Sequence, residues 1–192
     1  MNKRNFLALG ASVAAVTVLS TAGCTWTDAR TADPAAQRSS INAGAQSALS
    51  RLAATNPSSK ELVQQAKGVL VFPNVISGGF LVGAAAGDGV LLKGGKPVRY
   101  YRMAEGSVGL LAGAQSQAIF ILFMTDDALA RFEASNGWTA GADASVALLN
   151  VGGSASVDTN TARQPVVGYV LNNQGLMAGV SLNGSRITPL DI

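Results

Sequence analysis

The segment of residues 66–92 is the strongest constraint on the fold, because it is apolar over a long distance yet repeatedly interrupted. It is charged only near its two ends and contains six glycines and one proline. Its length would suit a membrane-spanning helix. However, Pro73, Gly78-Gly79 and Gly87-Asp88-Gly89 fall within it, and such turn residues favour short buried strands. We therefore predict a strand over residues 68–72 that ends at Pro73, and a hairpin-type turn at residues 87–89.

The glycine spacing in this segment is compatible with two structures. Gly79, Gly83 and Gly87 repeat every four residues, which permits close packing between membrane helices. In a strand, the same glycines mark bulges or a close approach of another backbone. We favour strands here and in a second uncharged run at residues 106–125.

The composition of the whole chain is that of one folded domain. Its 192 residues are 48% hydrophobic and 13% charged, which is enough for a substantial core. The formal net charge is +3, and two of the basic residues lie within the first 23 residues, which contain no acid. Without them, 12 basic and 11 acidic residues leave a net charge of +1. Such a weak charge gives little support to nucleic-acid binding.

Residues 1–23 read as a bacterial lipoprotein signal peptide. Lys3 and Arg4 precede an apolar stretch at residues 6–19, as in an export signal. The following Thr21-Ala22-Gly23-Cys24 resembles a lipobox, whose cysteine is diacylated and becomes the mature N-terminus. An ordinary secretory signal followed by a chance cysteine is the alternative. We favour the lipoprotein, because the only cysteine of the chain lies where a lipobox requires it.

The lipoprotein interpretation predicts both the domain organisation and the location. Cys24 would carry the acyl chains that anchor the protein in a membrane. Residues 24–33 would form a tether and residues 34–192 a single domain. Thr25 at the second mature position resembles lipoproteins that are passed to the outer membrane, so we expect an envelope protein that is periplasmic or surface-exposed.

Helix signals follow the tether. Asp33-Pro34 supplies an N-cap residue and a proline at the first helical position, and Asn56-Pro57 supplies a stop. Ser58 and Glu61 have the spacing of a capping box, which predicts a short second helix. Apolar residues at helical spacing predict the buried face of the first helix: Ile41, Ala45, Ala48, Leu49 and Leu52.

The rest of the chain reads mostly as strands. One helix is expected among them at residues 127–135, with Asp126 as its cap and Leu129 and Phe132 facing inward. Most gaps between strands are too short for a parallel crossover. The expected fold is therefore α+β, with N-terminal helices packed on a curled or barrel-like, mainly antiparallel sheet and one short helix inserted. Besides residues 68–72, the predicted strands are residues 90–92, 98–102, 106–115, 119–124, 138–151, 154–157, 166–171, 175–182 and 185–188.

Glycine and asparagine mark the turns between these strands. Gly94-Gly95 and Asn183-Gly184 are strong hairpin signals, and turns are also expected at residues 158–160 and 172–174. Residues 109–113 and 175–179 have similar sequences. An old duplication or two strands that meet the same glycine-dependent corner would explain the similarity, and we favour the second explanation.

Catalytic chemistry has little support in this sequence. The chain contains no histidine, and its only cysteine is assigned to lipidation, so His- or Cys-based nucleophilic and metal sites are excluded. The adjacent pair Asp126-Asp127 is explained more simply by helix capping. No phosphate-binding or dinucleotide-binding glycine loop occurs. We expect a protein that is not an enzyme and that holds no metal or cofactor.

A basic, aromatic cluster is the one candidate binding site. Lys93, Lys96, Arg99 and Arg102 occur within ten residues without an acid between them. Arginine and lysine suit phosphate oxygens, so the cluster could bind headgroups at a membrane surface. Alternatively, the lysines decorate a turn and the arginines protect an exposed edge strand. Strand alternation places Arg99 and Arg102 on opposite faces, which weakens the idea of one patch.

Several motifs occur in a characteristic order along the chain. They lie at residues 66–73, 78–83, 106–115, 127–132, 138–145 and 175–185, and the last is Gly175-Leu176-Met177-Ala178-Gly179 followed by Val180-Ser181-Leu182-Asn183-Gly184-Ser185. Together they resemble the signature of the SYLF domain family, also called the Ysc84 actin-binding domain family, over about residues 40–188. The sequence departs from the family at Arg99-Tyr100-Tyr101-Arg102, where a Trp-x-Pro-like step is usual.

The resemblance implies lipid binding, reported for phosphoinositides in eukaryotic members, and actin binding in some of them. An envelope protein would not meet cytoplasmic actin, and the first helix carries only Arg38 and Arg51 as basic residues. Two hypotheses remain: a domain that binds anionic, phosphoinositide-like headgroups, or an envelope protein that binds a protein partner and uses only its acyl chains to contact the membrane. From the residues themselves, we infer the headgroup site to be Lys67, Lys93, Lys96, Arg99 and Arg102.

Overall fold

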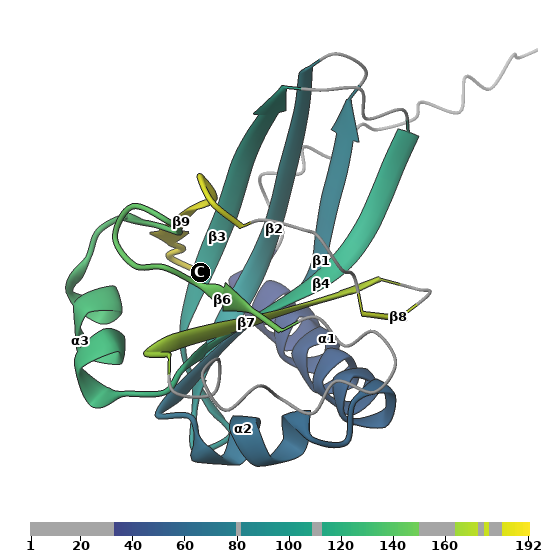
Figure 1. The fold of residues 1–192 in the computed structure, drawn as a ribbon. Coiled ribbons are helices and arrows are strands. Elements are labelled where there is room, and N and C mark those ends of the chain that lie inside the picture. The colour runs from purple at the N-terminus through teal and green to yellow at the C-terminus, as the bar shows by residue number, and fades with distance from the viewer. Residues whose placement is uncertain (1–32, 80–81, 109–112, 150–163, 173–174, 177–181) are drawn as a thin grey trace, which may run out of the picture. The chain divides into compact units, whose positions relative to one another are not determined.

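The computed structural model describes residues 33–79, 82–108, 113–149, 164–172, 175–176 and 182–192, which belong to one compact unit, Ala32–Ile192 (Figure 1). The helices are α1 (Pro34–Thr55), α2 (Ser59–Gln65) and α3 (Asp126–Ala134). The strands are β1 (Gly68–Gly79), β2 (Val82–Lys93), β3 (Lys96–Val108), β4 (Gly113–Phe123), β5 (Trp138–Thr139), β6 (Ala147–Leu148), β7 (Val166–Asn172), β8 (Gly175–Leu176) and β9 (Arg186–Pro189).

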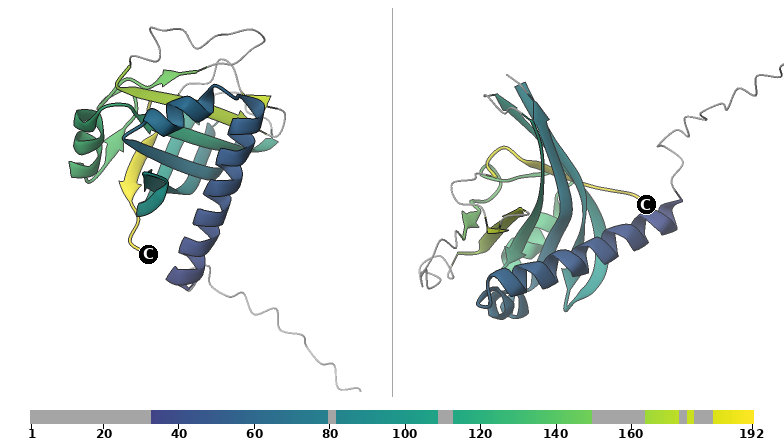
Figure 2. Two further views of the ribbon diagram at one scale, coloured as in Figure 1. Left: turned by 90° about the horizontal axis from the view of Figure 1, so that it is seen from below. Right: turned by 90° about the vertical axis from the view of Figure 1, so that its right-hand side faces the viewer.

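The strands form one sheet in the order β5-β9-β3-β2-β1-β4-β7-β6, and β8 pairs with β7. The pairs of described strands are antiparallel except β6 with β7. The sheet curls, with α1 and α2 on one face and α3 at its other side (Figure 2). The predicted α+β fold, with helices first and one short helix inserted between strands, is confirmed.

Both faces of the central strands are buried. The α1-side core, beneath α1 and α2, includes Val69, Val71, Phe120 and Leu122, whereas their neighbours along β1 and β4 point to the opposite face. That second face, the α3-side core, contains Leu70, Phe72, Tyr101, Ile119, Ile121, Phe123, Leu129, Phe132 and Trp138. Tyr101 and Phe123 both pack against Phe132 of α3, with ring centroids 4.8 and 4.7 Å apart.

Helix α1 begins and packs as its sequence predicts. The Asp33 side chain accepts a hydrogen bond from the Ala35 amide, and Pro34 is the first helical residue. Four of the five residues expected on the inner face are buried: Ile41, Ala45, Ala48 and Leu52. Polar contacts fix the earlier turns, because Gln37 Nε2 donates to Asp88 and Asn42 Nδ2 donates to the Tyr100 hydroxyl.

The sequence predicted that the first strand ends at Pro73, and this prediction is wrong. β1 continues to Gly79 between β2 and β4, and its register shifts between Phe72 and Val75 on the β4 side. A β-bulge at Pro73-Asn74 therefore absorbs the residue that lacks an N–H donor. The bulge allows β1 to contain a proline that would otherwise interrupt its hydrogen bonds to the neighbouring strands.

The predicted turn at residues 87–89 is also wrong, because these residues lie inside β2 opposite β3. Their glycines serve a close backbone approach, which was the other interpretation of glycine in this segment. A Cβ at Gly89 would lie 2.5 Å from the Val71 carbonyl oxygen and 2.5 Å from the Phe72 ring. A Cβ at Gly87 would lie 2.7 Å from the Asn74 carbonyl oxygen. Small residues on β2 thus accommodate the bulged strand beside it.

Two helix caps differ from the prediction. Ser58 forms no capping hydrogen bond at the start of α2, since its hydroxyl donates to Asn56 Oδ1 at 2.6 Å. Glu61 accepts a hydrogen bond from Gln65 instead of reaching back to the cap. In α3, Thr125 rather than Asp126 is the N-cap, and its hydroxyl oxygen accepts from the Ala128 amide at 3.2 Å.

Several strand boundaries differ as well. The predicted strand at residues 106–115 covers the end of β3 and the start of β4. Of the predicted strand at residues 138–151, the structure describes residues 138–149, and in that part only β5 and β6 are strands. The chain turns at Gly141, where φ is +86° and the amide donates to the Ala144 carbonyl. The turn at Asn183-Gly184 is confirmed, with a Gly184 φ of +91°, but the described strands on its two sides, β8 and β9, do not pair with each other.

Some predictions fall outside the described residues. These are the signal peptide and acylated Cys24, nearly all of the tether, the strand at residues 154–157, the turn at residues 158–160 and most of the two similar segments. Within residues 66–92, residues 68–79 and 82–92 form strands. Among the helices that the structure describes, none has the length and hydrophobicity needed to cross a membrane.

Replacing Gly89 should test the close approach at the bulge. Gly89→Ala places a Cβ against backbone and ring atoms that cannot move independently, so we expect a loss of about 2–4 kcal/mol in the free energy of unfolding. Urea unfolding at pH 7 measures this loss. Gly106→Ala is the matched control, because a Cβ at this strand glycine meets nothing within 4 Å. Equal effects of the two substitutions would contradict the close approach.

Tyr169 should make the fold sensitive to alkali. Its ring is fully buried, its hydroxyl has no hydrogen-bond partner among the described residues, and burial raises its pKa from 10.0 to about 12. The neutral phenol therefore stabilises the fold below pH 10, and this contribution, on the order of 2–3 kcal/mol, is lost as the pH rises from about 10 to 12.

We expect the free energy of unfolding of Tyr169→Phe at pH 7 to be close to that of the unchanged protein, since no hydrogen bond is lost. Above pH 10 the variant should lose stability less steeply. Urea midpoints measured from pH 7 to pH 12 give the two profiles. Parallel profiles for the two proteins would show that Tyr169 does not titrate in this way.

Candidate functional site

The candidate site is the hairpin that joins β2 to β3. Gly94 and Gly95 form its turn with φ values of +55° and +76°, which is the conformation of a type I′ hairpin. Lys93 and Lys96 face each other across the turn. The predicted turn at Gly94-Gly95 is thus confirmed, and it holds two of the predicted basic residues at the tip.

A bulge next to the turn brings a third cation to the same face. Leu92 pairs with Pro97 and Leu91 pairs with Arg99, so Val98 is the extra residue of β3. Arg99 consequently lies opposite Leu91 of the α3-side core, and Lys93 is two residues further along β2. Lys93, Lys96 and Arg99 therefore share the face on which α3 packs.

Carboxylates of α3 pair with two of the predicted site residues. Lys93 Nζ lies 2.7 Å from Glu133 Oε2, with both side chains partly exposed. Lys67 Nζ lies 3.6 Å from Asp126 Oδ2 at the start of the helix. These partly exposed ion pairs contribute little to stability. Their effect on a site is larger, because each removes a cation from the set available to a ligand.

Arg102 lies on the other face of the sheet and forms a bidentate ion pair. Its Nε and Nη2 donate to the two Asp88 carboxylate oxygens at 2.7 and 2.9 Å. This hydrogen bonding to Asp88 raises the pKa of the Arg102 guanidinium. Gln37 of α1 donates to the same carboxylate, so Arg102 belongs to the contact between α1 and the sheet. The prediction that Arg99 and Arg102 point to opposite faces is therefore confirmed.

Arg99 leans over an aromatic ring. Its Cζ lies 5.8 Å from the centroid of Tyr101, which is within the range of a cation–π contact. Burial raises the pKa of the Tyr101 hydroxyl, and the positive charge of Arg99 opposes this shift only in part. The phenol therefore stays neutral near pH 7 and leaves the Arg99 charge uncompensated.

The structure thus divides the five predicted residues. Lys67, Lys93 and Arg102 each have a carboxylate partner, whereas Lys96 and Arg99 form no ion pair among the residues that the structure describes. Between the last two lies Val98, which is 50% exposed. The tip formed by Lys96, Val98 and Arg99, here called the hairpin tip, presents two cations and an apolar group to the same surroundings.

The sequence indicated some of this site and missed the rest. Val98 was not among the predicted site residues. An apolar residue directly between a proline and an arginine at a hairpin end could have indicated it. The pairing of Lys93 with Glu133 spans 40 residues and depends on where α3 packs, so no local pattern reveals it. The partner of Arg102 was missed because Asp88 was assigned to a turn. Among the described residues, no group of three or more acidic, histidine or cysteine side chains could hold a metal ion.

Comparison with known proteins agrees with the family resemblance of the motifs. Residues 104–191, from the second half of β3 to the last strand and beyond, match the family model Ysc84, described as Las17-binding protein actin regulator. The match begins after the first two motifs, which lie at residues 66–73 and 78–83. No protein with a curated description matches the chain. Residues 104–191 thus match the SYLF domain family, represented by Ysc84, and the order of the motifs along the chain agrees with that match.

Proposed function

We propose that this protein is a lipid-anchored, non-enzymatic protein of the bacterial cell envelope whose SYLF domain binds anionic, phosphoinositide-like phospholipid headgroups. The family match supports a role in binding lipid or actin. We favour lipid, because the lipobox-like Thr21-Ala22-Gly23-Cys24 would take the chain to the envelope, away from cytoplasmic actin. Diacylation at Cys24 and attachment to the outer membrane belong to the same proposal.

The observation that carries the proposal is the hairpin tip. Lys96 and Arg99 supply unpaired positive charge, and Val98 supplies an exposed apolar side chain between them. A headgroup region offers phosphate oxygens beside acyl carbon, so the tip is complementary to it in both charge and polarity. Arg99 would bind a phosphate with two hydrogen bonds, and Lys96 would act as a mobile point charge.

The other basic residues play a lesser part. Lys67 and Lys93 lie on the same side as α3, but each would have to exchange a carboxylate for a phosphate. Arg102 is held against Asp88 on the far face. We therefore rank Lys96 and Arg99 first within the predicted set of Lys67, Lys93, Lys96, Arg99 and Arg102.

The binding free energies of the hairpin tip and of the acyl anchor suggest different roles for the two. A lysine or arginine near an anionic membrane contributes about 1 kcal/mol, so the two cations of the tip give weak binding alone. An acyl anchor gains about 0.8 kcal/mol for each buried methylene and holds the domain at the surface. The tip would then act at a high effective concentration and determine which lipids the domain contacts and how it is oriented.

Vesicle binding tests the proposal without the anchor. We expect residues 25–192, which contain the whole compact unit, to sediment with phosphatidylglycerol vesicles more than with neutral ones, and less so as salt increases. The double substitution Lys96→Gln and Arg99→Gln should weaken this binding about thirtyfold, because two cations are lost. Cardiolipin and phosphoinositide vesicles measure headgroup selectivity.

A charge-matched control separates the tip from net charge. Arg38→Gln with Arg51→Gln removes the same number of charges from α1, and it should change binding by much less. Unchanged binding after Lys93, Lys96, Arg99 and Arg102 all become Gln would disprove headgroup recognition. In that case the acyl chains would be the only membrane contact, and the alternative of an envelope protein that binds a protein partner would replace the proposal.

A further inference from the structure

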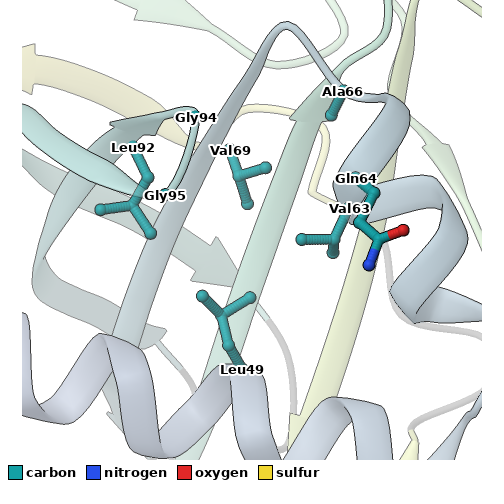
Figure 3. A pocket seen from close by; sticks show the side chains of 8 residues that line it. All are labelled: Leu49, Val63, Gln64, Ala66, Val69, Leu92, Gly94 and Gly95. Carbon is teal, nitrogen blue, oxygen red and sulfur yellow. The ribbon is translucent and has the colours of Figure 1, made fainter.

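An apolar pocket of about 320 Å³ lies between the two N-terminal helices and the sheet (Figure 3). Val69 of β1 and Leu92 of β2 form its inner wall, and both are buried in the α1-side core. Leu49 of α1 and Val63 of α2 approach from the helices, as the figure shows. The two helices therefore do not close completely over this end of the sheet, and apolar side chains remain open to water.

A second hollow continues the pocket along α2. Its volume is about 270 Å³, and it shares Leu49, Val63 and Gln64 with the first, so the two form one groove. The lining of this second part includes Ser50, Ser59 and Lys60. The groove is therefore apolar at the sheet and polar and cationic at its outer end.

Lys60 is the group at the outer end that can bind an anion. The Ser50 hydroxyl donates to the Gln46 carbonyl at 2.9 Å, and the Ser59 hydroxyl donates to the Asn56 carbonyl at 2.6 Å. Both hydroxyl hydrogens are thus already used. Lys60, in contrast, forms no ion pair within the described part of the chain. Its ammonium group remains available to a ligand.

We propose that this groove binds a medium-chain fatty acid, with its chain against Val69 and Leu92 and its carboxylate at Lys60. A chain covers apolar surface that is now exposed, which is the main favourable contribution to such binding. At roughly 30 Å³ per methylene, close to the share of a water molecule, the apolar part holds about ten carbons of one chain and not two chains. One chain and one cation fit a fatty acid better than a diacyl phospholipid.

The groove adjoins the hairpin, because Gly94 and Gly95 of its turn line the pocket, but it lies on the opposite face from the cations of the hairpin tip. Leu92 faces the α1-side core, whereas Lys93, Lys96 and Arg99 lie on the α3 side of the same hairpin. The inference therefore goes beyond the proposed headgroup binding and does not depend on it.

Photocrosslinking locates the bound chain directly. The full chain carrying Cys24→Ser, so that no covalent acyl group competes, is irradiated with a diazirine-labelled dodecanoic acid, and the labelled peptides are identified by mass spectrometry. We expect label on peptides that contain Leu49, Val63 or Leu92. Unlabelled fatty acids should compete more strongly as they lengthen to about ten or twelve carbons, and no more strongly beyond that length.

Two substitutions test the two ends of the groove. Val63→Trp fills the apolar part and should reduce groove labelling at least tenfold, while Gln65→Trp, on the same helix but outside the groove, should not. Lys60→Gln should weaken binding about two- to fivefold, as expected for one partly solvated ion pair. Lys60 is exposed, so this variant keeps the fold and the test does not depend on Val63→Trp alone.

The hairpin variant separates this inference from the proposed function. Lys96→Gln with Arg99→Gln should leave groove labelling unchanged even where it abolishes vesicle binding. Label confined to other peptides, or equal labelling of the Val63→Trp and Gln65→Trp proteins, would overturn the fatty-acid site whatever the vesicle experiment shows.

Discussion

Burial of both faces of the central strands is the constraint on which the rest of the structure depends. Val69 and Leu70 illustrate it, because neighbouring residues of β1 enter two different cores. Such strands need cover on each side. α1 and α2 provide it on one side and α3 on the other, and the α3 cover brings Glu133 and Asp126 beside the lysines of the sheet. The charge pattern of the candidate site thus follows from how the core is closed.

The sequence predicted the parts of the fold that local chemistry determines. Asp33-Pro34 starts α1 and Gly94-Gly95 turns the hairpin, since each signal acts within a few residues. The prediction failed at Pro73, because the room for a bulge there comes from a neighbouring strand and not from the local sequence. β2 carries glycine where β1 approaches closely, so β1 bulges and continues. The same physics explains the failed turn at residues 87–89. A proline and its compensating glycines lie on different strands, and only the pairing of those strands relates them.

Site prediction was limited in a similar way. The five basic residues were chosen by type and proximity in sequence, and alternation correctly separated Arg99 from Arg102. Which of them remain unpaired depends on carboxylates that only the fold brings near. Asp126 and Glu133 of α3 pair with two lysines, and Asp88 of the neighbouring strand pairs with Arg102, so the sequence could not rank them. The groove was hidden for the same reason, because Leu49, Val63 and Leu92 each read as ordinary core residues. In our two proposals, the hairpin tip would contact lipid headgroups with its charge and the groove would hold one acyl chain in its apolar recess.

Amide hydrogen exchange of the acylated chain on vesicles tests most directly whether the hairpin tip contacts an anionic membrane. The acyl anchor keeps the domain on phosphatidylglycerol vesicles and on neutral vesicles alike. A difference in hydrogen exchange between the two therefore reports headgroup contact alone. The account predicts slower exchange at residues 93–99 on the anionic vesicles, with little change along α1. Exchange at residues 93–99 that is the same on both vesicles, or slowing confined to α1, would contradict it.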